Sequence, residues 1–427
     1  MATKYLSRSP FDTAAIGLSP TATFVLVITA SWALPAGPLT ALFGAILVAY
    51  LLMSPSVANA AALRLALPFA VMAVWALIMS RGNDGYIVGK DAWYAGKLCL
   101  CLMLGFLLGI RAMNSHAILN ALVLLAGVMA VITIVLWLRS GASLGDVDVD
   151  TSRLPLVATA AIVPLVDRIR SQTGIARGQA AGLLALIALA VLASNSRITI
   201  IAMGVMILAS VGLFSRTRRA LLGGAAVVVL LALLWQFLPE YTGGELTVAI
   251  KLRRSLDEML LTDNVDPTAM ILNWRGFEAY NAQLMFDQSS ALRKLLGSGL
   301  GSTVDLGQEI VLEEGAMRFL PILHNGYYYL LIKYGLIGLL FYIVAVLRFG
   351  LLGKAADDNL RAEDRMLRGS IVAILLATSV ITGLYNKTEL NGLAIFVAWL
   401  IGFAQRQRYE ESVRVQMPHS PITGQQS

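Results

Sequence analysis

The chain has 427 residues, of which 57% are hydrophobic and only 14% are charged, and its net charge at neutral pH is +7. Soluble domains contain about 45–50% apolar and about 25% charged residues. This composition, with a mean hydropathy of +0.73, excludes a nucleic-acid-binding domain, a disordered chain and an ordinary cytosolic enzyme. It predicts an all-α polytopic membrane protein.

Twelve predominantly apolar runs follow one another along the chain, and a helix of about 20 such residues crosses a bilayer. The runs are 14–34, 38–54, 62–80, 93–110, 116–137, 154–167, 178–194, 198–215, 220–238, 326–347, 369–385 and 390–404. The sixth run is short and contains Pro155 and Pro164. We predict about 12 transmembrane helices, with helices 1–9 in residues 1–238, a loop at 239–325, helices 10–12 in 326–404 and a tail at 405–427.

Lysine and arginine accumulate in cytoplasmic loops, so their distribution predicts the orientation. With the amino terminus inside, the inner segments hold seventeen of these residues and the short outer loops hold six. This bias requires the sixth run to span, because otherwise every later loop would change sides. It predicts that both termini are cytoplasmic and that the 239–325 loop faces the periplasm.

The 239–325 loop is too long to be structureless, since such connections are usually functional. Its segments 246–261 and 268–286 carry apolar residues at helical spacing, which predicts amphipathic helices on the membrane face. The glycine-rich stretch 297–301 then interrupts the pattern, and we interpret it as a flexible joint. The loop is therefore predicted to be large and helical.

Two arginines lie on the predicted outer side. Arg197 begins the eighth run, where the free N–H groups of a helix start favour anions. Arg275 follows Trp274 on a predicted loop helix, with Glu278 three residues later. The alternatives are an interfacial arginine that reaches the lipid headgroups and a surface ion pair between Arg275 and Glu278.

Lys97 and Lys333 each lie one or two turns below the outer end of a predicted span. Ionisable groups inside a membrane are candidate functional residues, although at this depth their side chains also reach the headgroups. His324 and Asn325 precede the tenth run. A histidine at this boundary is suited to general-base chemistry; the alternative is an interfacial polar residue beside an aromatic belt at 327–329.

A run of alternating carboxylates precedes the sixth span. In an extended segment, Asp146, Asp148 and Asp150 would share one side and could bind a hard divalent cation. A solvated acidic loop is the favoured interpretation. We therefore predict neither a metal nor a cofactor.

Several short motifs occur in a fixed order: Asn195-Ser196-Arg197, Trp274-Arg275, the glycine-rich 297–301, His324-Asn325 and Tyr334-Gly335 with Gly338. Together with the predicted spans and outer loop, this order resembles the O-antigen ligase superfamily. That group also contains Wzy-type polysaccharide polymerases and some protein O-oligosaccharyltransferases.

The resemblance implies a GT-C-like membrane glycosyltransferase in the bacterial inner membrane, with a periplasmic active site. Its donor would be an undecaprenyl-diphosphate-linked glycan, and its reaction would be metal-independent and inverting. The family's functional arginines and histidine correspond to Arg197, Arg275 and His324. We expect Lys97, Lys333, Trp274 and Asn325 to contribute to substrate binding. The other implied partners are membrane lipid and an acceptor, with no nucleic acid.

The acceptor distinguishes two members of the superfamily. A ligase transfers the glycan to a lipid A-core sugar, and a polymerase transfers it to a second lipid-linked glycan. Many polymerases have two large outer loops with an arginine ten residues before a glycine, whereas this chain has one large loop without that spacing. We therefore favour a ligase, with a Wzy-type polymerase as the alternative.

A polysaccharide or lipid transporter, or flippase, is the alternative from another functional class. Coupled transporters place acidic groups or broken helices near the middle of the membrane. The charges within or beside the predicted spans lie towards the ends of the runs: Arg64, Lys97, Asp167 and Lys333. This placement favours a glycosyltransferase.

Overall fold

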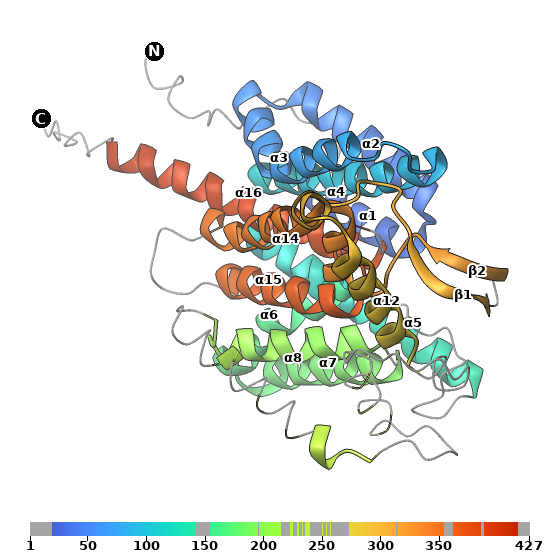
Figure 1. Cartoon of the computed structure of the whole chain (residues 1–427). Helices are drawn as coiled ribbons and strands as arrows, with labels where there is room; N and C mark the ends of the chain where they lie inside the picture. Colours follow the sequence, from blue (N-terminus) through green and yellow to red (C-terminus); the bar gives the residue numbers. More distant parts are fainter. Residues whose placement is uncertain are drawn as a thin grey trace, which may run out of the picture.

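The computed structural model describes residues 19–141, 154–194, 196–214, 273–312, 315–353, 362–385 and 388–416, with isolated positions between 223 and 257. Helices pack side by side into a bundle (Figure 1). The first group is α1 (Pro20–Ala33), α2 (Ala36–Met53), α3 (Ser56–Ile78), α4 (Gly85–Arg111) and α5 (Ser115–Ser140). A 3-10 helix, η1 (Leu156–Ala161), continues into α6 (Ile162–Ser171) and is followed by α7 (Gly174–Ala193) and α8 (Arg197–Ser210).

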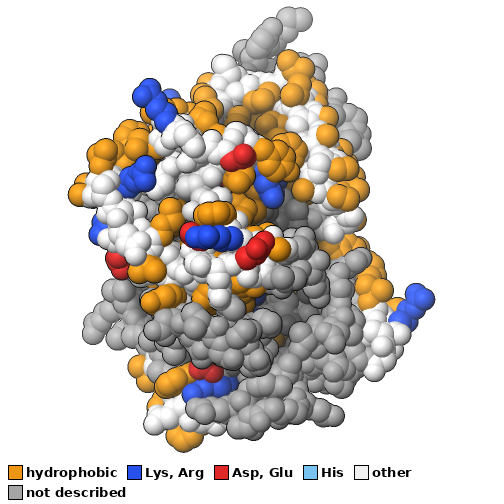
Figure 2. Space-filling view, turned by 45° about the vertical axis from the view of Figure 1, so that its right-hand side comes forward, with side chains coloured by type: hydrophobic (Ala, Val, Ile, Leu, Met, Phe, Trp, Pro, Cys, Tyr) orange, Lys and Arg blue, Asp and Glu red, His pale blue; other side chains and the backbone are white. Residues whose placement is uncertain are grey.

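The second group follows in the carboxy-terminal part. It consists of α12 (Trp274–Gln288), α13 (Ala291–Leu296), α14 (Gly326–Leu352), α15 (Ala362–Val380) and α16 (Thr388–Gln416). Among the described residues, α2, α3, α4, α5, α7 and α14 are long and apolar enough to cross a membrane. The bundle also exposes broad hydrophobic surface between few charged side chains (Figure 2). The protein is therefore a multi-pass membrane protein.

Helices occur at the predicted runs throughout the described chain. The doubtful sixth run corresponds to η1 and the first turn of α6, with buried side chains from 154 to 165. Pro155 precedes η1 and Pro164 lies in the first turn of α6, where proline removes no needed hydrogen bond. The ninth run, 220–238, and the predicted helix at 246–261 lie outside the described residues apart from isolated positions. Twelve spans therefore remain a prediction.

The all-α expectation is wrong in the predicted outer loop, which contains an antiparallel hairpin. Its strands are β1 (Val304–Leu312) and β2 (Gly315–Leu320), with Val304 opposite Leu320. Val304 and Leu306 are buried while Asp305 between them is exposed, which is the period of two of a half-buried strand. The hairpin projects from the end of the bundle opposite the carboxyl end of α16 (Figure 1). This agrees with a loop and a tail on opposite faces.

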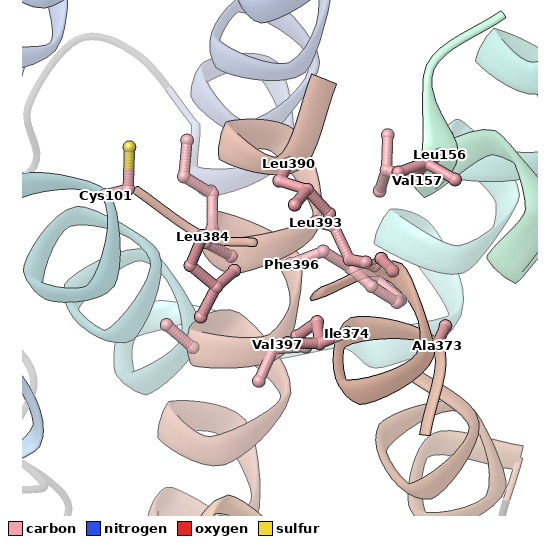
Figure 3. Close-up of a cluster of buried hydrophobic side chains, with 14 of the residues drawn as sticks. Cys101, Leu156, Val157, Ala373, Ile374, Leu384, Leu390, Leu393, Phe396 and Val397 are labelled. Carbon is pink, nitrogen blue, oxygen red and sulfur yellow. The ribbon is translucent and has the colours of Figure 1, made fainter. Parts of the chain in front are cut away.

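The last apolar run forms the centre of the bundle. Residues 390–404 of α16 are all buried, and its leucines and Phe396 pack against side chains of α4, η1 and α15 (Figure 3). Gly105 and Gly109 of α4 allow close backbone contact, since an added Cβ would lie 2.2 Å from Ile395 O and 2.1 Å from Trp399 O. Small residues are the usual means by which membrane helices approach this closely.

Candidate active site

The residues around His324 tie the start of α14 to the end of α15. Asn325 is the N-cap of α14, and its Oδ1 accepts hydrogen bonds from Tyr327 N at 3.0 Å and Tyr328 N at 3.4 Å. Gly326 N donates to Ile381 O at 3.1 Å. Because the backbone on this side of His324 is bonded to a neighbouring helix end, the position of the histidine is well defined.

A buried glutamate of α12 holds His324. Nδ1 of the histidine lies 3.0 Å from both Oε1 and Oε2 of Glu278, and the backbone N–H of His324 donates to Oε2 at 3.0 Å. The side chain of Glu278 is 2% exposed, whereas that of His324 is 40% exposed. This carboxylate therefore lies inside the protein against His324, and not on the surface where the ion-pair alternative had placed it.

Arg275 lies on the same helix as this glutamate. Trp274 and Arg275 are the first two residues of α12, and both are half-buried. The Trp274 ring packs against Phe277, with centroids 6.1 Å apart. Residues three apart on a helix share one side, so Arg275 begins the helical turn that bonds to His324. The structure thus brings together the predicted motifs around 274–275 and 324–325.

Arg197 lies at the same end of the bundle. Helices α8 and α15 are antiparallel, since a Cβ on Gly369 would lie 2.8 Å from Ala209 Cβ, and Arg368 Nη1 donates to Phe214 O at 3.4 Å. The sequence separation between Arg197 and Ala209 on one helix equals that between Gly369 and Ile381 on the other. Arg197 is therefore level with Ile381, whose carbonyl accepts the hydrogen bond beside His324. Asn195 lies outside the described residues.

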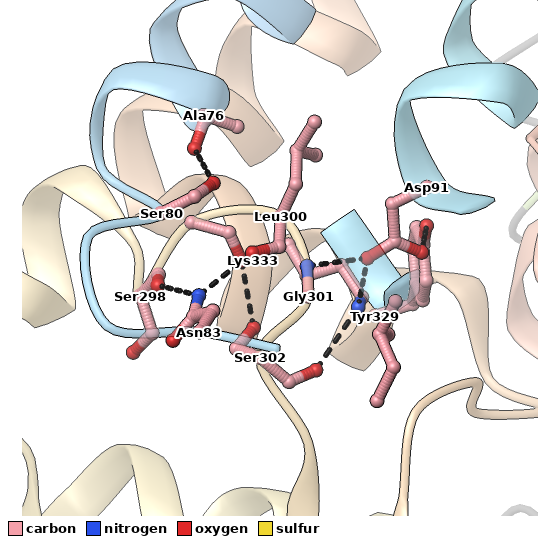
Figure 4. Close-up of polar contacts among 12 residues, drawn as sticks. Ala76, Ser80, Asn83, Asp91, Ser298, Leu300, Gly301, Ser302, Tyr329 and Lys333 are labelled. Atoms are coloured by element: carbon pink, nitrogen blue, oxygen red, sulfur yellow. Dashed lines mark hydrogen bonds and ion pairs between the residues drawn. The ribbon is translucent and has the colours of Figure 1, made fainter. Parts of the chain in front are cut away.

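The two lysines that were predicted to bind substrate are buried. Lys333 Nζ lies 2.5 Å from Asp91 Oδ2 and donates to Ser302 O at 3.0 Å. Tyr329 OH also donates to Asp91, at 3.0 Å (Figure 4). Lys97 is 2% exposed, with Nζ 5.2 Å from the centroid of the Tyr94 ring. Both lysine side chains are enclosed by protein, and Tyr329 belongs to the core instead of an aromatic belt.

The glycine-rich stretch 297–301 is not a flexible joint. Helix α14 is broken at Gly335, whose φ is +70°, and a helix break leaves carbonyl groups without helical partners. Ser298 N and Gly299 N donate to the carbonyls of Ile332 and Lys333, at 2.8 and 3.1 Å. The stretch therefore completes the broken helix, and its backbone N–H groups are used within the protein.

The same stretch also joins α14 to the α3–α4 turn. Leu300 N donates to Ala76 O at 3.1 Å. Asn83 Nδ2 donates to Leu300 O at 2.7 Å, and Gly301 N donates to Asp91 Oδ2 at 2.7 Å (Figure 4). Asp91 and the break at Gly335 are features that the sequence interpretation did not include. Both are satisfied by contacts inside the protein.

The possible cation site falls outside the described part of the chain. Asp146, Asp148 and Asp150 belong to the segment between α5 and η1 whose placement is not described. Among the described residues, no group of three or more histidine, cysteine, aspartate or glutamate side chains could hold a metal ion. The interpretation of this run as a solvated acidic loop therefore stays a prediction.

Comparison with known proteins finds a match to the region that contains the candidate site residues. A family model described as O-antigen ligase matches residues 182–343. The matched region contains α8, α12, the glycine-rich stretch, the hairpin and the start of α14, and so includes Arg197, Arg275 and His324. A search of curated proteins found no match. The resemblance seen in the sequence is confirmed over residues 182–343, which are similar to the O-antigen ligase family.

Proposed function

We propose that this protein is an O-antigen ligase-type glycosyltransferase. It would transfer a glycan as a single block from undecaprenyl diphosphate to a saccharide acceptor on the periplasmic face of the inner membrane. The observation that supports this proposal is the contact between α12 and the start of α14, which joins Arg275 and His324 through Glu278. Arg197 lies at the same end of the bundle.

The two arginines would bind the leaving group. A diphosphate leaves readily once its developing negative charge is neutralised, and the guanidinium group makes paired hydrogen bonds to phosphate oxygens. Arg197 begins α8, and Arg275 lies in the first turn of α12. They approach the bundle end from two different helices. A donor aimed at the charge that forms in the transition state contributes about 10²–10³ in rate.

His324 would act as the general base. The acceptor hydroxyl gives its proton to the imidazole while its oxygen attacks the anomeric carbon. The bond from that carbon to the diphosphate oxygen breaks, and the diphosphate leaves with the electron pair. A single displacement of this kind inverts the anomeric configuration. No metal is needed in this mechanism, because the arginines neutralise the diphosphate.

We treat the remaining proposed binding residues as two groups. Trp274 lies beside Arg275, and we retain it as a substrate-binding residue. Lys333 pairs with Asp91, Lys97 is buried among helices and Asn325 caps α14. We propose a structural role for these three, with donor binding through Lys97 or Lys333 left as the alternative.

Reconstitution into liposomes tests the proposal directly. The purified protein is given undecaprenyl-diphosphate glycan either with lipid A-core or alone, in the presence of EDTA. Glycosylated lipid A-core is the expected product. Longer lipid-linked glycan from donor alone would instead identify a polymerase. Movement of donor between leaflets without a new glycosidic bond would overturn the proposal in favour of a transporter, and activity that needs added Mg²⁺ or Mn²⁺ would overturn the metal-independent mechanism.

A further inference from the structure

The contact between Glu278 and His324 determines more than the place of the ring. Glu278 is 1% exposed and its neighbours Phe277 and Ala282 are buried with it. A buried carboxylate is costly unless donors satisfy it. It accepts the backbone N–H of His324 and faces Nδ1 with both oxygens at 3.0 Å. An ionised carboxylate only accepts hydrogen bonds, so the favourable arrangement has the proton on Nδ1.

We propose that Glu278 is a positioning residue that fixes His324 in the Nδ1–H tautomer. The lone pair then lies on Nε2, at the other edge of a ring whose side chain is 40% exposed. This inference rests on the proposed function, in which Nε2 takes the proton of the acceptor hydroxyl. The partner bonded to one ring nitrogen sets the protonation of the other, and here that partner is a residue of the helix that carries Arg275.

His324 and Glu278 together account for every proton that moves in the transfer step. The acceptor hydroxyl proton moves to Nε2 as its oxygen bonds to the anomeric carbon, and the diphosphate leaves with the electrons of the broken bond. The imidazolium that forms keeps its Nδ1–H on Glu278, whose negative charge stabilises it. Nε2 afterwards releases the proton to water. Glu278 itself stays ionised throughout.

Replacing the carboxylate by an amide should reverse the tautomer without changing the shape of the site. In Glu278→Gln the single amide oxygen can accept the backbone N–H of His324, which leaves the NH₂ group facing Nδ1. An NH₂ group only donates, so Nδ1 must then accept and the ring proton moves to Nε2. Nε2 can no longer act as a base, although the glutamine fills the same space.

The tautomer can be read without an activity assay. The chain has three histidines, so His116→Gln and His419→Gln leave His324 as the only ¹⁵N-histidine signal in the full-length protein. At alkaline pH, where the neutral ring is observed, the ¹⁵N shifts should show Nδ1 protonated and Nε2 bare. In Glu278→Gln the two shifts should exchange. Glu278→Asp retains the charge and should keep the Nδ1–H form.

Kinetics then test whether the tautomer matters. Glu278→Gln should lower kcat by about 10²–10⁴, the range that a general base contributes, and change KM for the donor by less than about twofold, since phosphate binding is left to the arginines. Glu278→Asp should recover part of the rate. Asp287→Asn removes an exposed carboxylate from the same helix, which bonds Gln283, and should leave both constants unchanged.

Two results would overturn the inference. One is an Nε2–H tautomer in the protein that keeps Glu278 and lacks the other two histidines, a result that does not depend on any variant at position 278 folding. The other is a Glu278→Gln protein that exchanges its tautomer yet keeps full kcat. If the Nδ1–H form is observed but no glycan is transferred to any acceptor, the proposed function fails while the tautomer assignment stands.

Discussion

Removing one member of the Asp91–Lys333 pair should destabilise the protein strongly. The two side chains are 1% and 2% exposed, and Nζ lies 2.5 Å from Oδ2. Lys333→Met leaves the Asp91 carboxylate with the hydroxyl of Tyr329 and the N–H of Gly301 but without a counter-ion. Breaking a buried pair from one side costs about 3–5 kcal/mol. We expect a loss of that size in the free energy of unfolding.

A double-variant cycle separates this cost from simple loss of packing. Asp91→Asn alone leaves a buried ammonium opposite an amide and should cost a similar amount. The combination with Lys333→Met removes both charges, so it should be more stable than either single variant, with a coupling of about 0.5–3 kcal/mol. Equilibrium unfolding of the purified variants in lipid bicelles measures these differences, with donor affinity measured on the same samples.

Donor affinity distinguishes a structural role of the Asp91–Lys333 pair from a role in substrate binding. If the pair holds the fold, the double variant binds the donor about as tightly as the unaltered protein. If Lys333→Met is as stable as the unaltered protein but binds the donor weakly, the ammonium serves the donor phosphates. The substrate-binding role expected from the sequence would then be the right one, and our structural interpretation would be wrong.

Three further variants test other parts of the structure. Gly335→Ala should abolish the folded, monodisperse peak in size-exclusion chromatography, because φ is +70° and the new Cβ would lie 2.3 Å from a backbone oxygen, whereas Gly89→Ala enters open space and should not. Arg275→Lys should insert normally and lose about 10²–10³ in transfer rate, since an ammonium lacks the paired donors of guanidinium. The hydrogen bonds from Arg318 hold the pKa of the Asp305 carboxyl below its usual value. That pair therefore contributes stability at neutral pH that is lost as pH falls through the lowered pKa, and Arg318→Ala should move the pKa up in an NMR titration of the carboxyl.

Much of the helical framework could be predicted because hydropathy reports burial directly. The run 390–404 carries no charge and is apolar on every side, which is the pattern of a helix surrounded by others. It forms the centre of the bundle. The sixth run could also be predicted, since its two prolines precede η1 or lie in the first turn of α6. In each case a local property of the segment decides the structure.

Asp91 was missed because hydropathy shortened its helix. The apolar run begins at 93, but α4 begins at Gly85, where Asp84 Oδ1 caps the helix by accepting from Ile87 N at 3.0 Å. An aspartate before a glycine and an apolar segment is a readable N-cap signal, and it would have placed Asp91 inside the helix. Its partner Lys333 lies 242 residues away, and no local pattern reports such a contact.

The burial of Glu278 and the hairpin were not predicted from the sequence, for two different reasons. Glu278 lies four residues after Trp274 and next to Phe277, so it was already on the buried stripe of its helix; its spacing from Arg275 favoured the surface interpretation instead. In β1, the alternation of Val304 and Leu306 gives way to exposed residues before Ile310. A register shift breaks the period in the middle of the strand, and a periodicity search therefore sees too little of it.

The two ends of the α12–α13 segment explain how Arg275 acquires a fixed position. At one end Glu278 bonds to His324, and at the other the 297–301 stretch supplies the hydrogen bonds that the break in α14 requires. One anchor, His324, directly precedes α14 and the other lies at the break in α14, so α12 cannot move without breaking one of them. An arginine held in this way needs no reorganisation when charge develops on the diphosphate, which is the condition under which electrostatic stabilisation is largest. The helix expected to lie loosely on the membrane is thus part of the catalytic framework proposed here.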